Sequence, residues 1–277
     1  MTCTPGEIQA IADHILAASD AGSSIEPVTD TLTGFSLEDA YRVSVRITER
    51  RIARGERPIV RKIGFTNRTI WEEYGVHAPI WAPMYDSTVE GTDAPALPVL
   101  CSLFGLVEPR IEPEIIFRIA TPPQPEMEAP ELLSCIDAVA HGFEIVQSLF
   151  PGWRFAAPDT VAAFALHGRL RHGPLVPLDA DQDRAEWAGM LSNFEIGLKR
   201  DGVAVDRGAA VNVLDGPLFA LAHFVRGLVD DPLGRRLQVG DLVSTGTITR
   251  AFPVCPGETW TSEVIGLPLP GMSIAFF

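Results

Sequence analysis

The sequence is poor in cysteine, in basic side chains and in long apolar runs. Its four cysteines (Cys3, Cys101, Cys135 and Cys255) are scattered and form no C-x-x-C pair, which indicates reduced thiols rather than disulfides or zinc ligands. No apolar run reaches the length of a membrane span. The N-terminal stretch also lacks the basic region and unbroken apolar core of a signal peptide. These absences favour a cytoplasmic protein that does not enter membranes.

Positive charge is scarce: 22 Lys and Arg stand against 36 Asp and Glu in 277 residues, a formal net charge of −14. Such a surface repels phosphate backbones and anionic membranes, which argues against nucleic-acid binding. A small anionic substrate stays compatible, because a metal ion or a local Lys/Arg pocket can reverse the field. With 46% hydrophobic and 21% charged residues, the composition is that of a globular protein with a substantial core.

Apolar residues at helical spacing predict two N-terminal helices. The first begins after Thr4, with Pro5 at the first helical position and Glu7 completing a capping box. The second runs from Ser36 to about Ala53. Further helices are predicted at 129–139, 184–198 and 215–229, with Asp215 as a possible cap of the last, and a short helix or turn is predicted at 67–76.

Short β-like runs and proline-rich loops dominate the chain from Ala78 onward. Strands are predicted at 58–66, 107–119, 141–148 and 241–249, and an exposed loop at 120–130. The sequence therefore predicts an α+β protein. Residues 1–75 would form a small helical α/β region and residues 76–277 a larger β-rich catalytic domain.

The stretch VEPRIEPEII (107–116) carries two glutamates, Glu112 and Glu114, separated by Pro113. On a strand both side chains project from one face, with apolar neighbours on the other. Pro113 cannot donate a ladder hydrogen bond, which predicts a sheet edge or a bulge. Neighbouring carboxylates repel unless a cation or proton intervenes, and oxygen ligands suit Mg²⁺ or Mn²⁺. For the pair alone, a solvated strand face is the more common explanation, because charged residues are mostly exposed.

A third carboxylate, Glu144, lies between Phe143 and Ile145 in the apolar stretch HGFEIVQSLF. An isolated carboxylate is costly to bury there. A third ligand from a separate strand is what an octahedral metal site would use. Glu144 therefore favours a metal site over a solvated face.

Six motifs, in order along the chain, resemble the fumarylacetoacetate hydrolase superfamily, and in particular its branch of 2-keto-4-pentenoate hydratases and 4-oxalocrotonate decarboxylases. They are RKIGFTN, RIEPEI, FEIVQS, DTVAAFALHG, NVLDGPLFALA and VSTGTITRAFPVCPGETW. The resemblance covers the chain from about residue 36 to the C-terminus. It implies a mixed β-roll or distorted barrel behind the helical region, Mg²⁺ (or Mn²⁺) as cofactor, and a homo-oligomer.

The resemblance also assigns roles to particular positions. It implies Glu112, Glu114 and Glu144 as metal ligands, while Glu108 has no ligand role and is expected at the surface or at the mouth of the site. Catalytic and substrate-binding positions implied by the motifs are Lys62 above the metal, the turn formed by Thr245, Gly246 and Thr247, and His77 in a segment similar to the family's mobile cover.

Several positions depart from the branch. Its hydratases usually read EIVDS and DTVADNASSG; here Gln147 replaces an aspartate, Ala163 and Phe164 replace Asp-Asn, and Leu166 and His167 replace Ser-Ser. These changes remove charge and hydrogen-bonding groups near the expected site, which puts the standard hydratase substrate in question. His167 could act in catalysis as a proton shuttle, bind a substrate carboxylate, or merely satisfy a local carbonyl.

The implied function is a metal-dependent lyase acting on a 2-oxo (2-hydroxy-dienoic) acid. The first hypothesis is hydration of the 2-keto-4-pentenoate type, with water added at C4. The second is decarboxylation of the 4-oxalocrotonate type. C–C bond hydrolysis of an acylpyruvate follows, weakened because the segment CSLFGLVEPRI lacks the histidine of the hydrolases' His-Glu pair. A non-catalytic binding homologue is the remaining alternative.

Overall fold

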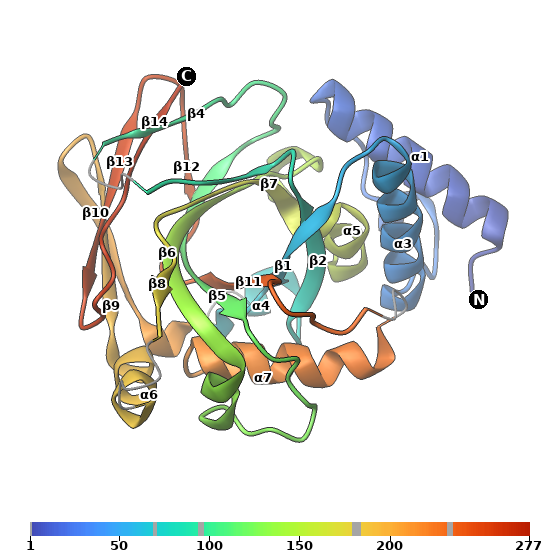
Figure 1. Ribbon diagram of the computed structural model, residues 1–277. Helices are drawn as coiled ribbons and strands as arrows, with labels where there is room; N and C mark the ends of the chain where they lie inside the picture. Colours follow the sequence, from blue (N-terminus) through green and yellow to red (C-terminus); the bar gives the residue numbers. More distant parts are fainter. Residues whose placement is uncertain (1, 69–70, 94–96, 179–183, 232–234) are drawn as a thin grey trace.

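A computed structural model describes residues 2–68, 71–93, 97–178, 184–231 and 235–277, apart from the side chains at 73 and 74 (Figure 1). The helices are α1 (Pro5–Ala21), α2 (Val28–Thr31), α3 (Leu37–Ala53), α4 (Trp71–Tyr74), α5 (Ala157–Ala162), α6 (Arg184–Asn193) and α7 (Pro217–Gly227). The strands are β1 (Pro58–Gly64), β2 (Ile80–Tyr85), β3 (Val89–Gly91), β4 (Val99–Cys101), β5 (Arg110–Ile119), β6 (Ile136–Val146), β7 (His167–His172), β8 (Val176–Pro177), β9 (Glu195–Arg200), β10 (Val203–Ala209), β11 (Leu242–Thr247), β12 (Phe252–Pro253), β13 (Thr259–Ile265) and β14 (Ser273–Phe276). None of these described helices is both long and apolar enough to cross a membrane.

The larger sheet curls into a half-barrel with the order β2-β1-β11-β5-β6-β7-β3, while β12 pairs with β5 and β8 with β6 (Figure 1). The pairs β1–β11 and β3–β7 are parallel and the other pairs of this sheet are antiparallel. A second sheet, β10-β9-β13-β14-β4, lies across the barrel from α1 and α3. The mixed barrel with an N-terminal helical region confirms the predicted fold class.

The predicted cap of the first helix is present, and the second helix is also capped at its predicted start. The Thr4 hydroxyl accepts a hydrogen bond from the Glu7 N–H, and the Glu7 carboxylate accepts one from the Thr4 N–H. Ser36 caps α3 by accepting from the Asp39 N–H. Apolar faces of α1 and α3 share one core with β2 and with the segment 149–165. The helical region therefore supports a segment that borders the site described below.

Helices α6 and α7 cover the outer face of the barrel. Leu218, Leu221 and Phe224 of α7 pack in one cluster with Ile115 and Phe117 of β5. Burying side chains of this size contributes about 1.5–3 kcal/mol each. Because alternate residues face opposite sides, fixing this apolar face of β5 turns Glu112 and Glu114 inward, as predicted.

Three details of the predicted elements are wrong. Residues 129–139 do not form a helix: Glu131–Cys135 is a 3₁₀ turn and Ile136 begins β6. The predicted helix 184–198 ends at Asn193, and β9 follows. Short apolar runs buried on both faces do not distinguish helix from strand, and in both places pairing with distant strands decides. The cap of α7 is Gly216 rather than Asp215.

The sheet-edge interpretation of Pro113 is also wrong, because β5 lies between β11 and β6. The expected bulge is found in the partner strand, where the register of β11 against β5 shifts between Ser244 and Thr247, opposite Glu114. The division at residue 75 stays a prediction, although β1 is part of the large sheet.

Candidate metal centre and active site

The carboxylates meet because of the register of β5 and β6. Glu112 lies directly opposite Glu144, and Glu114 lies opposite Gly142. Like charges placed across a strand pair destabilise a sheet. Nevertheless, Glu112, Glu114 and Glu144 each offer a carboxylate oxygen, and these oxygens lie within 4.8 Å of one another. Such an arrangement calls for a compensating cation.

The bulge of β11 holds one oxygen of Glu114. Oε2 accepts hydrogen bonds from the Ser244 hydroxyl and, at 3.1 Å, from the Gly246 N–H. Gly246 has φ 98°, and a Cβ there would lie 1.9 Å from Thr66 Oγ1, so this turn requires glycine. The other oxygen, Oε1, is buried and has no hydrogen-bond partner among the described residues.

Glu144 is held by charged and ring donors instead. Its Oε1 lies 2.8 Å from Lys62 Nζ and 2.9 Å from His167 Nδ1. All three side chains are almost completely buried. Its Oε2 is also buried and finds no hydrogen-bond partner in the described part of the chain.

Burial and charge push the carboxyl pKa values in opposite directions. Burial raises the pKa of Glu112 to about 7. Burial also raises the pKa of Glu114 well above its usual range, and the charges of Glu144 and Glu112 raise it further. Burial also opposes ionisation of Glu144, but Lys62 and His167 outweigh it and hold the pKa of Glu144 below its ordinary value. Burial would lower the pKa of Lys62, yet the surrounding glutamates raise it. The ammonium and Glu144 are therefore both ionised at neutral pH.

These residues fit a divalent cation. Two of their buried oxygens, Glu114 Oε1 and Glu144 Oε2, have no hydrogen-bond partner among the described residues and are available to a cation. Oxygen donors are those that Mg²⁺ and Mn²⁺ prefer. With all three carboxylates ionised, Lys62 leaves two negative charges uncompensated, which one divalent cation would balance.

A cavity opens beside this cluster. Lys62, Glu112, Glu114, Gly246 and Thr247 line its polar side. Its apolar lining includes a cluster that consists of Phe65, Val146, Trp153, Phe155 and Leu166. Arg110, Thr66 and Asn67 also line the cavity. The site thus combines an ionic end with an apolar wall.

The remaining predicted site residues lie around the cavity at different depths. Thr245 is buried outside the described cavity lining, and its hydroxyl donates to the Ile115 carbonyl at 2.9 Å, which fastens the bulge. His77 is exposed and also lies outside the described lining. His167 lies behind Glu144 rather than in the described lining. Their predicted roles in substrate binding and catalysis stay predictions.

Glu108 is exposed, as expected, and its carboxylate accepts a hydrogen bond from the Gly152 N–H.

Among the departures from the branch pattern, Leu166 faces the cavity. Gln147 links two segments, because it accepts from the Val107 N–H and donates to the His167 carbonyl. Ala163 and Phe164 lie in the core shared with the N-terminal helices. Phe164, Ala165 and Leu166 have φ of 59°, 48° and 65°, a left-handed run that costs roughly 1–2 kcal/mol per residue.

Sequence reasoning missed several residues that border the site. Arg110 could have been found, because it lies two positions before Glu112 and so shares its strand face. Its guanidinium carbon lies 3.9 Å from the centroid of the Trp153 ring. Trp153, Phe155 and Thr88 carry no local signal, since their positions depend on loops that return to the barrel.

No family model matches the chain, but individual known proteins resemble it over almost its whole length. It is 30% identical over 267 residues to a 2-keto-4-pentenoate hydratase of Paraburkholderia xenovorans (strain LB400), covering 95% of this chain and 93% of that protein. It is 28% identical over 269 residues to a 4-oxalocrotonate decarboxylase of Pseudomonas sp. (strain CF600), covering 96% of each.

Solved structures agree. The 4-oxalocrotonate decarboxylase from Pseudomonas putida G7, complexed with magnesium and adipate, superposes with a TM-score of 0.89 at 27% identity and covers 100% of this chain and 99% of its own. Fumarylpyruvate hydrolase from Pseudomonas aeruginosa, in complex with Mn²⁺ and pyruvate, gives a TM-score of 0.57 at 16% identity, covering 79% and 88%, and supports the fold alone.

Fold and site define a protein of the fumarylacetoacetate hydrolase fold with a carboxylate cluster suited to a divalent metal. Within that fold, the chain belongs to the family of 2-keto-4-pentenoate hydratases and 4-oxalocrotonate decarboxylases.

Proposed function

We propose that the protein is a divalent-metal-dependent hydro-lyase that hydrates a 2-hydroxy-2,4-dienoic acid. The observation that carries the proposal is the cluster of Glu112, Glu114 and Glu144 at a cavity, in which two buried oxygens have no hydrogen-bond partner within the described part of the chain. The names of the relatives, a hydratase and a decarboxylase, support the reaction class.

The proposed roles follow from the contacts. Glu112, Glu114 and Glu144 would hold Mg²⁺ or Mn²⁺, whose charge stabilises the enolate form of a 2-oxo acid. Lys62 is ionised and fixed by Glu144 at 2.8 Å, so it presents positive charge and a proton to the substrate. Gly246 and Thr247 line the cavity beside the cluster, where they would contact the substrate head, and Thr245 would hold this turn in place. His77 is proposed to contact substrate when its segment covers the site.

The apolar cluster of the cavity orients the rest of the substrate. On the inner face of the barrel, Arg110 and Val146 form the pair next to Glu112 and Glu144, about 7 Å further along the strands. Trp153 and Leu166 pack with Val146 there. A short hydrocarbon tail would bury against these side chains without leaving a polar group unpaired.

A second candidate function, decarboxylation of a dienoic dicarboxylate, is favoured by Arg110. Its Nε is buried without a hydrogen-bond partner among the described residues, and the side chain lines the cavity. A terminal carboxylate at the far end of the substrate would pair with this guanidinium.

Purified protein tests both. With Mg²⁺, hydration of 2-hydroxypenta-2,4-dienoate would bleach its ultraviolet absorbance, whereas decarboxylation of 2-oxohex-3-enedioate would release CO₂. Glu114→Ala should abolish either reaction, and EDTA should do the same to the wild type. Turnover of neither substrate would refute both functions and leave C–C hydrolysis or ligand binding to be tested. Full activity in EDTA would refute the metal's role.

We also propose a cytoplasmic homo-oligomer. Leu100, Phe104 and Phe277 are 67%, 88% and 63% exposed, and β4 pairs with β14 beside them. An apolar patch of this kind marks an interaction surface. Light scattering should give a mass above 30.0 kDa for the wild type and a smaller assembly for Phe104→Ser. A monomeric wild type would contradict the proposal.

A further inference from the structure

His167 is placed to position a metal ligand. Its Nδ1 lies 2.9 Å from Glu144 Oε1, and the side chain is almost completely buried. A carboxylate only accepts, so Nδ1 carries the proton of this hydrogen bond. Neutral and protonated imidazole both keep this donor. The contact therefore does not depend on the charge of the ring.

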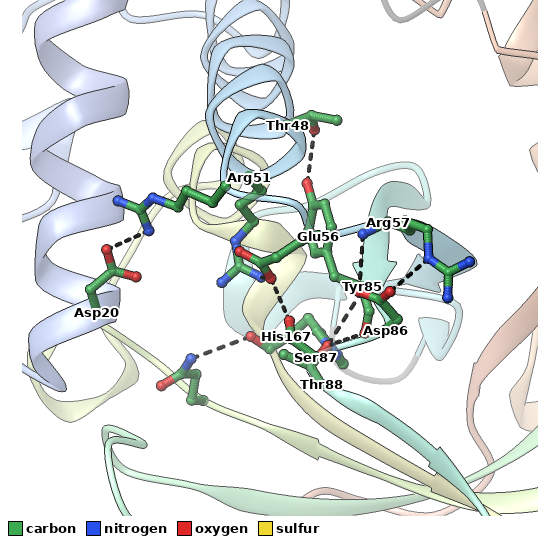
Figure 2. Close-up of polar contacts among 12 residues, drawn as sticks. Asp20, Thr48, Arg51, Glu56, Arg57, Tyr85, Asp86, Ser87, Thr88 and His167 are labelled. Carbon is green, nitrogen blue, oxygen red and sulfur yellow. Dashed lines mark hydrogen bonds and ion pairs between the residues drawn. The ribbon is translucent and has the colours of Figure 1, made fainter.

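The second ring nitrogen is fixed as well. Nε2 lies 2.9 Å from Thr88 Oγ1, and the Thr88 hydroxyl lies 3.0 Å from the Tyr85 carbonyl, in the turn between β2 and β3. Tyr85 in turn reaches Thr48 of α3 with its hydroxyl at 3.0 Å (Figure 2). Gln147 donates to the His167 carbonyl at 3.3 Å. The imidazole thus bridges Glu144 and a turn that is anchored to the N-terminal helices.

This arrangement decides which oxygen of Glu144 faces the cluster. Oε1 is occupied by both Lys62 and His167, which leaves Oε2 as the buried oxygen without a partner in the described residues. With Lys62 alone, the carboxylate could rotate about its terminal bond, because sp³–sp² torsions have broad minima. Two donors on one oxygen remove that freedom.

We propose that His167 is a positioning residue, which holds Glu144 so that Oε2 is presented to the divalent cation and which connects this ligand to the β2–β3 turn through Thr88. The inference rests on the proposed metal site. Serine, the residue usual in the hydratases of the branch, has one atom beyond Cβ. It could not reach Glu144 and Thr88 from opposite ends as imidazole does.

Calorimetric titration of the full-length protein with Mg²⁺ tests the proposal. His167→Ser should weaken Mg²⁺ binding about 10- to 100-fold, the usual effect of removing a group that orients a ligand. His167→Asn, whose amide nitrogen takes the place of Nδ1, should stay within about threefold of the wild type. Thr88→Val should weaken binding less than His167→Ser, because the bond to Glu144 remains. His172→Ala, in the same strand, is the matched control and should bind like the wild type.

Activity separates positioning from direct catalysis. If His167 only positions Glu144, saturating Mg²⁺ should restore most of kcat in His167→Ser.

Two results would overturn the proposal. One is wild-type Mg²⁺ affinity in both His167→Ser and His167→Ala. The other is an affinity of His167→Asn as weak as that of the serine variant. Lost kcat with normal affinity would assign the residue to the chemistry instead. Absence of Mg²⁺ binding by the wild type would refute the proposed function itself. Unfolding in EDTA shows which variants are folded, and His167→Asn remains informative if the serine variant is not.

Discussion

The two strands that build the metal centre hold their carboxylates by different means. On β5, Glu114 accepts from neutral groups of β11, the Ser244 hydroxyl and the Gly246 N–H. On β6, Glu144 accepts from the Lys62 ammonium and from the His167 ring. Burial and the charges of Glu144 and Glu112 raise the pKa of Glu114, whereas Lys62 and His167 outweigh burial and lower the pKa of Glu144. Without a cation, Lys62 and His167 favour the ionised form of Glu144, whereas burial opposes ionisation of Glu114, whose charge a bound cation would compensate.

Removal of either ligand should have the largest effect. Glu114→Gln and Glu144→Gln should each weaken Mg²⁺ binding by more than about 100-fold, because each loses a negatively charged donor from a buried site. Titration calorimetry measures this directly. Retained affinity in either variant would remove that residue from the set of metal ligands.

Stability without metal should separate the same two variants. Glu144→Gln leaves the buried Lys62 ammonium without its ionic partner, which costs about 3–5 kcal/mol. Glu114→Gln should cost less than about 1 kcal/mol, because the raised pKa favours the neutral form of Glu114 without metal and glutamine retains an acceptor. Urea unfolding in EDTA at pH 7 gives both values. Equal losses would contradict the assigned difference between the two sides.

The neutral side depends on the bulge of β11. Gly246→Ala would place a Cβ 1.9 Å from Thr66 Oγ1, and we expect a loss of about 3 kcal/mol from overpacking and backbone strain together. Gly257 is the matched control, with φ 91° and open space where a Cβ would lie, so Gly257→Ala should cost about 1 kcal/mol. Urea midpoints in EDTA compare the two. A Gly246→Ala protein as stable as the control would mean that the turn can relax.

The smallest predicted effect is the pH dependence of metal binding. Burial raises the pKa of Glu112 to about 7, above its unfolded value of about 4.3. The stability that this raised pKa contributes to the metal-free fold is present below about pH 4 and is lost as pH rises through 7. Mg²⁺ must displace the proton, so its affinity should fall as pH falls below 7. The shift of Tm caused by Mg²⁺ should therefore be larger at pH 8 than at pH 6. Equal shifts would show that Glu112 is already ionised.

The positions of the carboxylates and the starts of the N-terminal helices could be anticipated from the sequence, because they arise from local patterns. Glu112 and Glu114 share a face of β5 by strand periodicity, and Glu144 interrupts an apolar strand. Thr4 and Ser36 mark the starts of their helices by capping. The partners of each carboxylate were harder to find. Lys62 and the turn at 245–247 were implied only by family resemblance.

Other features depend on contacts between distant segments. The start of β6 at Ile136 follows from pairing with β5, and the bulge of β11 from a register shift. His167 reaches Glu144 through a left-handed turn at 164–166, which Phe164, Ala165 and Leu166 do not favour as isolated residues. Thr88 meets the ring only when β3 pairs with β7. No local pattern carries such information.

The central claim is that a divalent cation binds to the carboxylate oxygens that have no partner among the residues the structure describes. Anomalous diffraction from crystals soaked in Mn²⁺ tests it at the level of single atoms. The predicted result is one Mn²⁺ bonded to Glu114 Oε1, Glu144 Oε2 and a Glu112 oxygen, with Glu144 Oε1 still facing Lys62 and His167. A cluster without Mn²⁺, or an ion bonded to Glu144 Oε1 instead, would contradict it.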